Sequence, residues 1–180
     1  MNILALDLST NTGWAFGILG SVQPTFGSVR FGQAESLHTA RFAKCLEWTS
    51  AFLKRQPETG LVVFEAPLHF GLRRGKSNAG NDELAFGLAA IVQAVAHLRG
   101  VHDVRQARTI DVRRFFLGNN PKRNVAKRET IGRCHALGLE VEDDNQADAV
   151  ATWFYQCAQL QPQFGLRVSP LFAGAAPGVL

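Results

Sequence analysis

The chain has 180 residues, 46% of them hydrophobic, which suffices for one domain with a buried core and gives no reason to expect a second. Its three cysteines, Cys45, Cys134 and Cys157, are odd in number and lack C-x-x-C spacing, so neither a disulfide framework nor a zinc knuckle is indicated. A formal net charge of +4 makes polyanions suitable partners.

The first apolar run, residues 3–8, has no basic segment before it and contains Asp7, so it predicts a strand and not a signal peptide. The longest apolar stretch, residues 84–98, is shorter than the roughly 20 residues of a membrane span and is interrupted by Gln93. We therefore expect a cytoplasmic protein without a membrane partner.

The spacing of the apolar residues predicts alternating strands and helices. A continuous apolar run is typical of a buried strand, and a stripe at spacings of three and four is typical of an amphipathic helix. Asn11-Thr12-Gly13 is a turn signal, so the first two strands should form a hairpin. In chain order we expect strands at 3–8, 14–18 and 27–31, a helix from a cap at Ser36 or Thr39 to about Arg55, a strand at 61–65, a helix at 82–99, a strand at 104–107, and helices at 110–117, 124–137 and from 143 or 144 to 160.

This order predicts an α/β domain with a mixed sheet, in which three antiparallel strands lead into parallel strands and helices flank the sheet. We assign residues 1–162 to this domain. Residues 163–180 are poorly patterned and rich in glycine, alanine and proline, so we expect a disordered tail. The stripe of the helix at 82–99 is widened by alanines, and both core packing and a homodimer seam stay open for it.

Four acidic residues are unusual for the elements that contain them. Asp7 lies within the first strand and Glu65 ends the fourth, although a buried carboxylate is costly unless it is paired or bound to a cation. Asp144 and Asp148 are four positions apart, so they lie a turn apart on one helical face. Because strands one and four should be neighbours, we expect all four carboxylates to converge.

Converging carboxylates repel one another without a cation, and their hard oxygen atoms select Mg²⁺ or Mn²⁺ over zinc. Two such ions about 4 Å apart can cleave a phosphodiester, since one activates water and the other stabilises the leaving oxygen. The structural alternatives are a plain strand residue for Asp7 and a helix cap for Asp144.

Basic residues cluster in the sequence between Glu65 and Asp144. Each cluster alone is equally typical of a solvated helix face. The clusters are Arg73, Arg74 and Lys76; Arg105, Arg108, Arg113 and Arg114; and Lys122, Arg123, Lys127 and Arg128.

In its ordered set of segments the chain resembles the RuvC-like Holliday junction resolvases of the RNase H-like superfamily, particularly the phage-type members. The matching segments are residues 3–15 with Asp7, 62–67 with Glu65, 118–122 together with Lys127, and 144–151 with Asp148. This resemblance spans about residues 1–160. It implies a bacterial or phage-encoded homodimer, acting in DNA recombination and repair, that nicks four-way junctions and leaves 5′-phosphate and 3′-hydroxyl ends.

The resemblance also implies roles for single residues. Asp7, Glu65 and Asp148 fall on the family's catalytic, metal-binding positions, which hold two Mg²⁺ or Mn²⁺ ions. Family members carry an acid or histidine three residues before the last aspartate, where this chain has Asn145. Because an amide is a neutral and weaker ligand, we expect Asp144 to be the fourth catalytic ligand.

Branched DNA, especially a four-way junction, is the partner that the resemblance implies, with phosphate contacts that do not read sequence. In the loop after Glu65, Phe70 is a candidate for stacking on a base, with core or dimer packing as the alternative, and His69 is a candidate for proton transfer. The residues expected to bind DNA are Arg73, Arg74, Lys76, Lys122, Arg123 and Lys127.

Three other functions are weighed against this one. A different nuclease of the same superfamily, acting on flaps, branched DNA or RNA–DNA hybrids, would use the same carboxylates. A phosphotransferase of the sugar-kinase and actin type has a similar first strand, but it needs a second lobe and a second phosphate loop for which 180 residues leave no room. A protein that binds without cutting would not need the acidic set.

Overall fold

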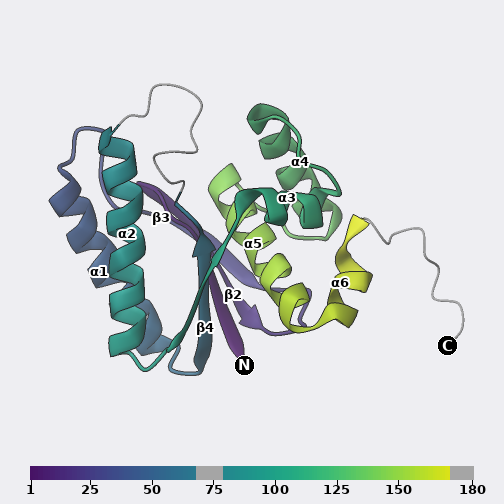
Figure 1. The fold of residues 1–180 in the computed structure, drawn as a ribbon, viewed down its shortest axis with the longest axis horizontal. Coiled ribbons are helices and arrows are strands. Elements are labelled where there is room, and N and C mark those ends of the chain that lie inside the picture. The colour runs from purple at the N-terminus through teal and green to yellow at the C-terminus, as the bar shows by residue number, and fades with distance from the viewer. Residues whose placement is uncertain (68–78, 171–180) are drawn as a thin grey trace, which may run out of the picture.

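The structure is a computed structural model, and it describes residues 1–67 and 79–170. A five-stranded sheet is covered by helices on both faces (Figure 1). The strands are β1 (Asn2–Asp7), β2 (Asn11–Ile18), β3 (Thr25–Arg30), β4 (Thr59–Glu65) and β5 (Asp103–Ala107), and the helices are α1 (His38–Arg55), α2 (Ala79–Leu98), α3 (Thr109–Leu117), α4 (Arg123–Ala136), α5 (Asp144–Leu160) and α6 (Pro162–Val168).

The strands lie in the order β3-β2-β1-β4-β5. β2 pairs antiparallel with both β1 and β3, whereas β4 pairs parallel with both β1 and β5. The mixed sheet predicted from the sequence is therefore confirmed. β1 and β4 are neighbours, so their carboxyl ends meet at one edge of the sheet.

Strand alternation divides the buried residues into two apolar cores, one on each face of the sheet. α1 and α2 cover one face, and α5 with α3, α4 and α6 covers the other (Figure 1). In the first core lie Leu4 and Leu6 of β1 and Val62 and Phe64 of β4, and in the second lie Ile3 and Ala5 of β1 and Leu61 and Val63 of β4. By the same alternation, Asp7 and Glu65 point to the α5 face.

The predicted turn at residues 11–13 is wrong, because these residues begin β2. The chain reverses just before them, where the Thr12 hydroxyl accepts a hydrogen bond from the Ser9 amide and donates one to the Ser9 carbonyl. Gly13 serves a close approach instead of a turn. A Cβ atom at Gly13 would lie 1.9 Å from the backbone oxygen of Asn145, so only glycine lets the start of α5 contact β2.

The cap predicted for α1 is wrong, whereas the start predicted for α5 at residue 143 or 144 is confirmed. α1 begins after Leu37 without a side-chain cap, and the Ser36 hydroxyl accepts from the Gln33 amide instead. α5 is capped by Asp143, whose carboxylate accepts from the Gln146 amide at 2.8 Å. Because Asp143 caps this helix, Asp144 is left for another role.

α2 lies beside α1 and packs its apolar stripe into the core (Figure 1). Leu84, Leu88 and Val95 are buried as the sequence predicts. Leu98, placed in the same stripe, is 82% exposed. One helical face of α2 is thus used within the chain, and the homodimer seam stays a prediction.

α6 occupies residues that the sequence assigned to a poorly patterned tail. Phe164 and Val168 are buried in the α5-side core, where the Phe164 ring stacks on Phe154 with ring centroids 5.7 Å apart. Residues 171–180 lie outside the described residues, and the domain boundary at 162 stays a prediction. Within the described ranges, no helix combines the length and apolarity that crossing a membrane requires.

Candidate active site

Three separate elements bring carboxylates to one end of the sheet. Asp7 ends β1 and Glu65 ends β4, one position beyond the paired residues Leu6 and Phe64. α5 crosses the same face of the sheet, and Asp148 lies in its second turn. Its neighbours along the helix are small and fully buried alanines, so the helix can lie close to the strands. Gly13 removes the remaining obstacle to that approach.

The pKa of Asp7 is raised well above its usual range. Burial is the largest cause, followed by the negative charges of Asp148, Glu65 and Asp144, while Lys127 acts in the opposite direction. The other three predicted carboxylates therefore lie within electrostatic reach of Asp7. The structure thus brings their charges near one another, and their convergence on one metal site stays a prediction.

Burial likewise raises the pKa of Asp148, to about 6. The charges of Glu65 and Asp144 add to this rise, and the cations of Arg113 and Lys127 oppose it. A carboxylate that resists ionisation between other carboxylates is stabilised by a cation placed among them. The site is thus electrostatically prepared for added positive charge.

The donor set suits a hard divalent cation, although the side chains are not gathered around one point. Among the described residues, no three histidine, cysteine, aspartate or glutamate side chains form a ready group of metal ligands. Two of the carboxylates are engaged by protein groups: Thr109 donates a hydrogen bond to Glu65, and Lys127 forms an ion pair with Asp144. Rotation of these side chains toward the centre would supply the oxygen atoms that Mg²⁺ or Mn²⁺ prefers.

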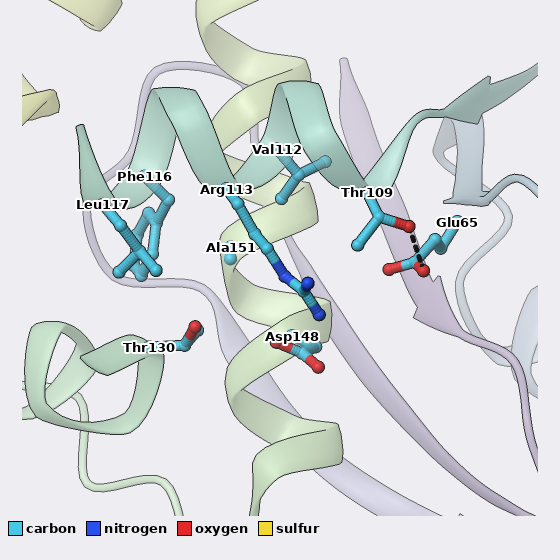
Figure 2. A pocket seen from close by; sticks show the side chains of 9 residues that line it. All are labelled: Glu65, Thr109, Val112, Arg113, Phe116, Leu117, Thr130, Asp148 and Ala151. Atoms are coloured by element: carbon cyan, nitrogen blue, oxygen red, sulfur yellow. Dashed lines mark hydrogen bonds between the residues drawn. The ribbon is translucent and has the colours of Figure 1, made fainter. Parts of the chain in front are cut away.

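Figure 2 shows the cleft beside these carboxylates, with Glu65 and Asp148 in its wall. α3 supplies much of the remaining lining. Thr109 at its start points to Glu65, and Arg113 one turn later extends its guanidinium toward Asp148 (Figure 2). Sequence reasoning missed Thr109 and saw Arg113 only as part of a basic cluster. One signal was available in the sequence. Thr109 and Arg113 are four positions apart on α3, and α3 directly follows β5, the strand that pairs with β4 and Glu65.

The predicted basic residues are distributed over two segments. Lys122 and Arg123 are exposed at the start of α4, and Lys127, a turn later, faces the acidic site through its pair with Asp144. The loop residues His69, Phe70, Arg73, Arg74 and Lys76 lie outside the described residues.

Both candidates for the fourth ligand lie at the start of α5. Asp144 contributes a charge that acts on Asp7 and on Asp148. Asn145 meets β2 through its backbone oxygen, which lies over Gly13. The electrostatic reach of Asp144 supports it as the fourth carboxylate, and its role as a ligand stays a prediction.

No protein-family model and no curated protein matches the sequence. Among solved structures, RuvC of Thermus thermophilus is 16% identical, with a TM-score of 0.63 over 92% of this chain and 97% of that chain. This chain has the RuvC fold. T. thermophilus RuvC in complex with a Holliday junction substrate is 15% identical, with a TM-score of 0.65 over 92% of this chain and 96% of the other. The yeast mitochondrial Holliday junction resolvase Ydc2 is 13% identical, with a TM-score of 0.55 over 92% of this chain and 83% of that chain.

The likeness extends over nearly the whole chain and confirms the predicted RNase H-like architecture. At these identities the likeness is one of fold, so the chemistry must be argued from the residues of this chain.

Proposed function

We propose that this protein is a divalent-metal-dependent endonuclease that nicks four-way DNA junctions. The observation that carries the proposal is the clustering of negative charge beside a cleft: burial and the charges of neighbouring carboxylates among Glu65, Asp144 and Asp148 raise the pKa values of Asp7 and Asp148. The RuvC fold supports the choice of substrate, because one solved neighbour is a complex with a Holliday junction.

The four carboxylates would hold two Mg²⁺ or Mn²⁺ ions. When bound, such ions lower the pKa of a bound water and neutralise charge on the phosphate. In the reaction, a water oxygen forms a bond to phosphorus while the bond from phosphorus to the 3′ oxygen breaks. The water loses a proton to solvent and the leaving oxygen takes one up, which gives 5′-phosphate and 3′-hydroxyl ends.

Basic residues near the site would hold the DNA backbone. Lys122 and Arg123 are exposed on α4, beside Lys127 at the acidic site. Contacts to phosphates fix the position of DNA without reading its sequence. We assign the same role to Arg73, Arg74 and Lys76 in the loop that follows Glu65. Because a junction is resolved by two symmetric nicks, we further propose that the active form is a homodimer.

The direct test is cleavage of a labelled four-way junction by the purified protein in Mg²⁺, beside a flap, a linear duplex and an RNA–DNA hybrid of the same sequence. We expect paired symmetric nicks on the junction, absent when a chelator is added. Cleavage restricted to flaps or hybrids would replace the junction by another substrate of a related nuclease. Binding of the junction without any Mg²⁺-dependent cleavage would overturn the nuclease proposal.

A further inference from the structure

Helix α3 is fixed to the acidic site at its first residue. The Thr109 hydroxyl donates a hydrogen bond to Oε1 of Glu65. This bond links the start of α3, just after β5, to the end of the neighbouring strand β4. Arg113 lies four positions later, on the same side of the helix. It therefore enters the cleft beside Thr109, and its guanidinium points to Asp148 (Figure 2).

Three other arginines in the described part of the chain donate guanidinium hydrogen bonds to protein oxygen atoms. Arg105 binds both carboxylate oxygens of Asp103 at 2.8 Å, Arg41 donates to two backbone carbonyls, and Arg133 donates to the Val168 carbonyl at 2.8 Å. These contacts tie each side chain to the fold.

Arg113 differs from these arginines. Within residues 1–67 and 79–170, its side chain is assigned no hydrogen bond and no ion pair, although it is half-buried. Its charge reaches Asp148 and opposes the rise in the pKa of that carboxyl. The guanidinium thus lies in the cleft near the acidic site, with its donors uncommitted to the surrounding described residues.

A planar guanidinium with uncommitted donors binds a phosphate through two parallel hydrogen bonds, which an ammonium group does not reproduce. We propose that Arg113 is a further catalytic residue that binds a nonbridging oxygen of the scissile phosphate. The inference rests on the proposed nuclease function. Negative charge grows on these oxygens as water attacks phosphorus, so a guanidinium fixed there stabilises the transition state. Thr109 is a positioning residue, because its hydrogen bond orients the Glu65 carboxylate next to the Arg113 side of the cleft.

The test compares Arg113→Ala and Arg113→Lys with Arg114→Ala, which removes the same charge from the exposed next residue of α3. Single-turnover cleavage of the junction is measured with the protein saturating. We expect Arg113→Ala to slow cleavage about 10²- to 10³-fold, as for loss of one preorganised donor, with junction affinity changed less than about threefold. Arg113→Lys should recover only part of the rate, and Arg114→Ala should stay within about threefold.

A second measurement separates phosphate binding from mere support of Asp148. A methylphosphonate at the cleavage position replaces one nonbridging oxygen by a methyl group. If Arg113 binds that oxygen, one of the two diastereomers should slow the parent protein strongly and slow Arg113→Ala little further. Fully additive losses for both diastereomers, or a higher Mg²⁺ requirement as the sole defect of Arg113→Ala, would show a structural role and overturn the inference.

The parent protein and Asp7→Asn are run alongside these variants. If the parent protein cuts no substrate of the panel, the nuclease proposal fails. If the parent cuts, Asp7→Asn does not, and Arg113→Ala cuts at the parental rate, the inference about Arg113 alone fails. The melting temperature of each variant verifies that it is folded.

Discussion

The two faces of the sheet are built from the same strands, yet they differ in chemistry. The last residues of β1 and β4 that face α1 and α2 are Leu6 and Phe64, which are completely buried in an apolar core. The next residues of the same strands, Asp7 and Glu65, face α5, and their negative charges repel each other. The difference teaches that both faces stabilise the fold through an apolar core, and that only the strand ends on the α5 face give up stability to assemble a charged site.

The largest expected effect is on the charged face. Asp7→Asn and Glu65→Gln should each slow Mg²⁺-dependent cleavage by at least about 10²- to 10³-fold, because each removes a charge that the proposed metal site needs. Junction binding should persist, since both residues carry the same charge sign as DNA. Cleavage and gel-shift assays measure the two properties.

Glu58→Gln is the matched control for these variants. Glu58 is exposed just before β4, at the end of the sheet opposite Glu65, where it accepts a hydrogen bond from Asn2. Its loss should leave cleavage unchanged. Undiminished cleavage by Asp7→Asn would remove Asp7 from the catalytic set.

The apolar face should respond in stability and not in metal dependence. Leu88 of α2 is completely buried, and Leu88→Ala should lower the free energy of unfolding by about 2–5 kcal/mol through lost burial and a cavity. Urea denaturation measures the loss. Leu46→Ala on α1, where the side chain is 51% exposed, should change stability by about 0.5 kcal/mol at most. A changed Mg²⁺ requirement in folded Leu88→Ala would contradict the separation of the two faces.

The cost of the charged face should appear as a pH dependence of the chelated protein. The pKa of Asp148 is raised to about 6, so its favourable contribution to stability is complete below the unfolded value near 4 and is lost as the pH rises through 6. Asp148→Asn should therefore raise the free energy of unfolding by roughly 2 kcal/mol at about pH 7.5, and by almost nothing at about pH 4.

Urea denaturation in a chelator at both pH values measures this difference. Asp111→Asn, which breaks a surface pair with Arg108, is the control, with an expected change within about 0.5 kcal/mol. If Asp148→Asn instead has a lower free energy of unfolding at the higher pH, the ionised carboxylate stabilises the fold through favourable contacts, and the expected destabilisation is wrong.

The smallest effect is expected at Thr109. Thr109→Val keeps the side-chain shape and removes the hydrogen bond to Glu65, so cleavage should slow about tenfold, as one hydrogen bond to a charged group implies. Thr109→Ser should restore the rate, and Thr39→Val on the exposed surface of α1 should have no effect. Equal rates for the valine and serine variants would exclude a positioning role for the hydroxyl.

Much of the fold could be predicted because periodicity and helix-ending signals are local. The errors came where one residue type serves two purposes. Gly13 in a turn and Gly13 under a helix look alike in sequence, and only packing against Asn145 distinguishes them. α6 was missed because its seven residues have weak patterning of their own and are held by Phe164 and Val168 in a core formed by distant segments.

The sequence by itself determined which groups are available and how they repeat: Asp7 and Glu65 in apolar strands, and Asp144 and Asp148 a turn apart on one helix. Side chains alternate between the two faces of any strand. If β1 and β4 pair in the observed register, Asp7 and Glu65 must therefore lie on the same face of the sheet. Only the tertiary structure decided that they are neighbours, that α5 covers that face, and that α3 brings Thr109 and Arg113 to the cleft. The reason is that distances between remote segments are set by packing, to which local sequence patterns contribute little.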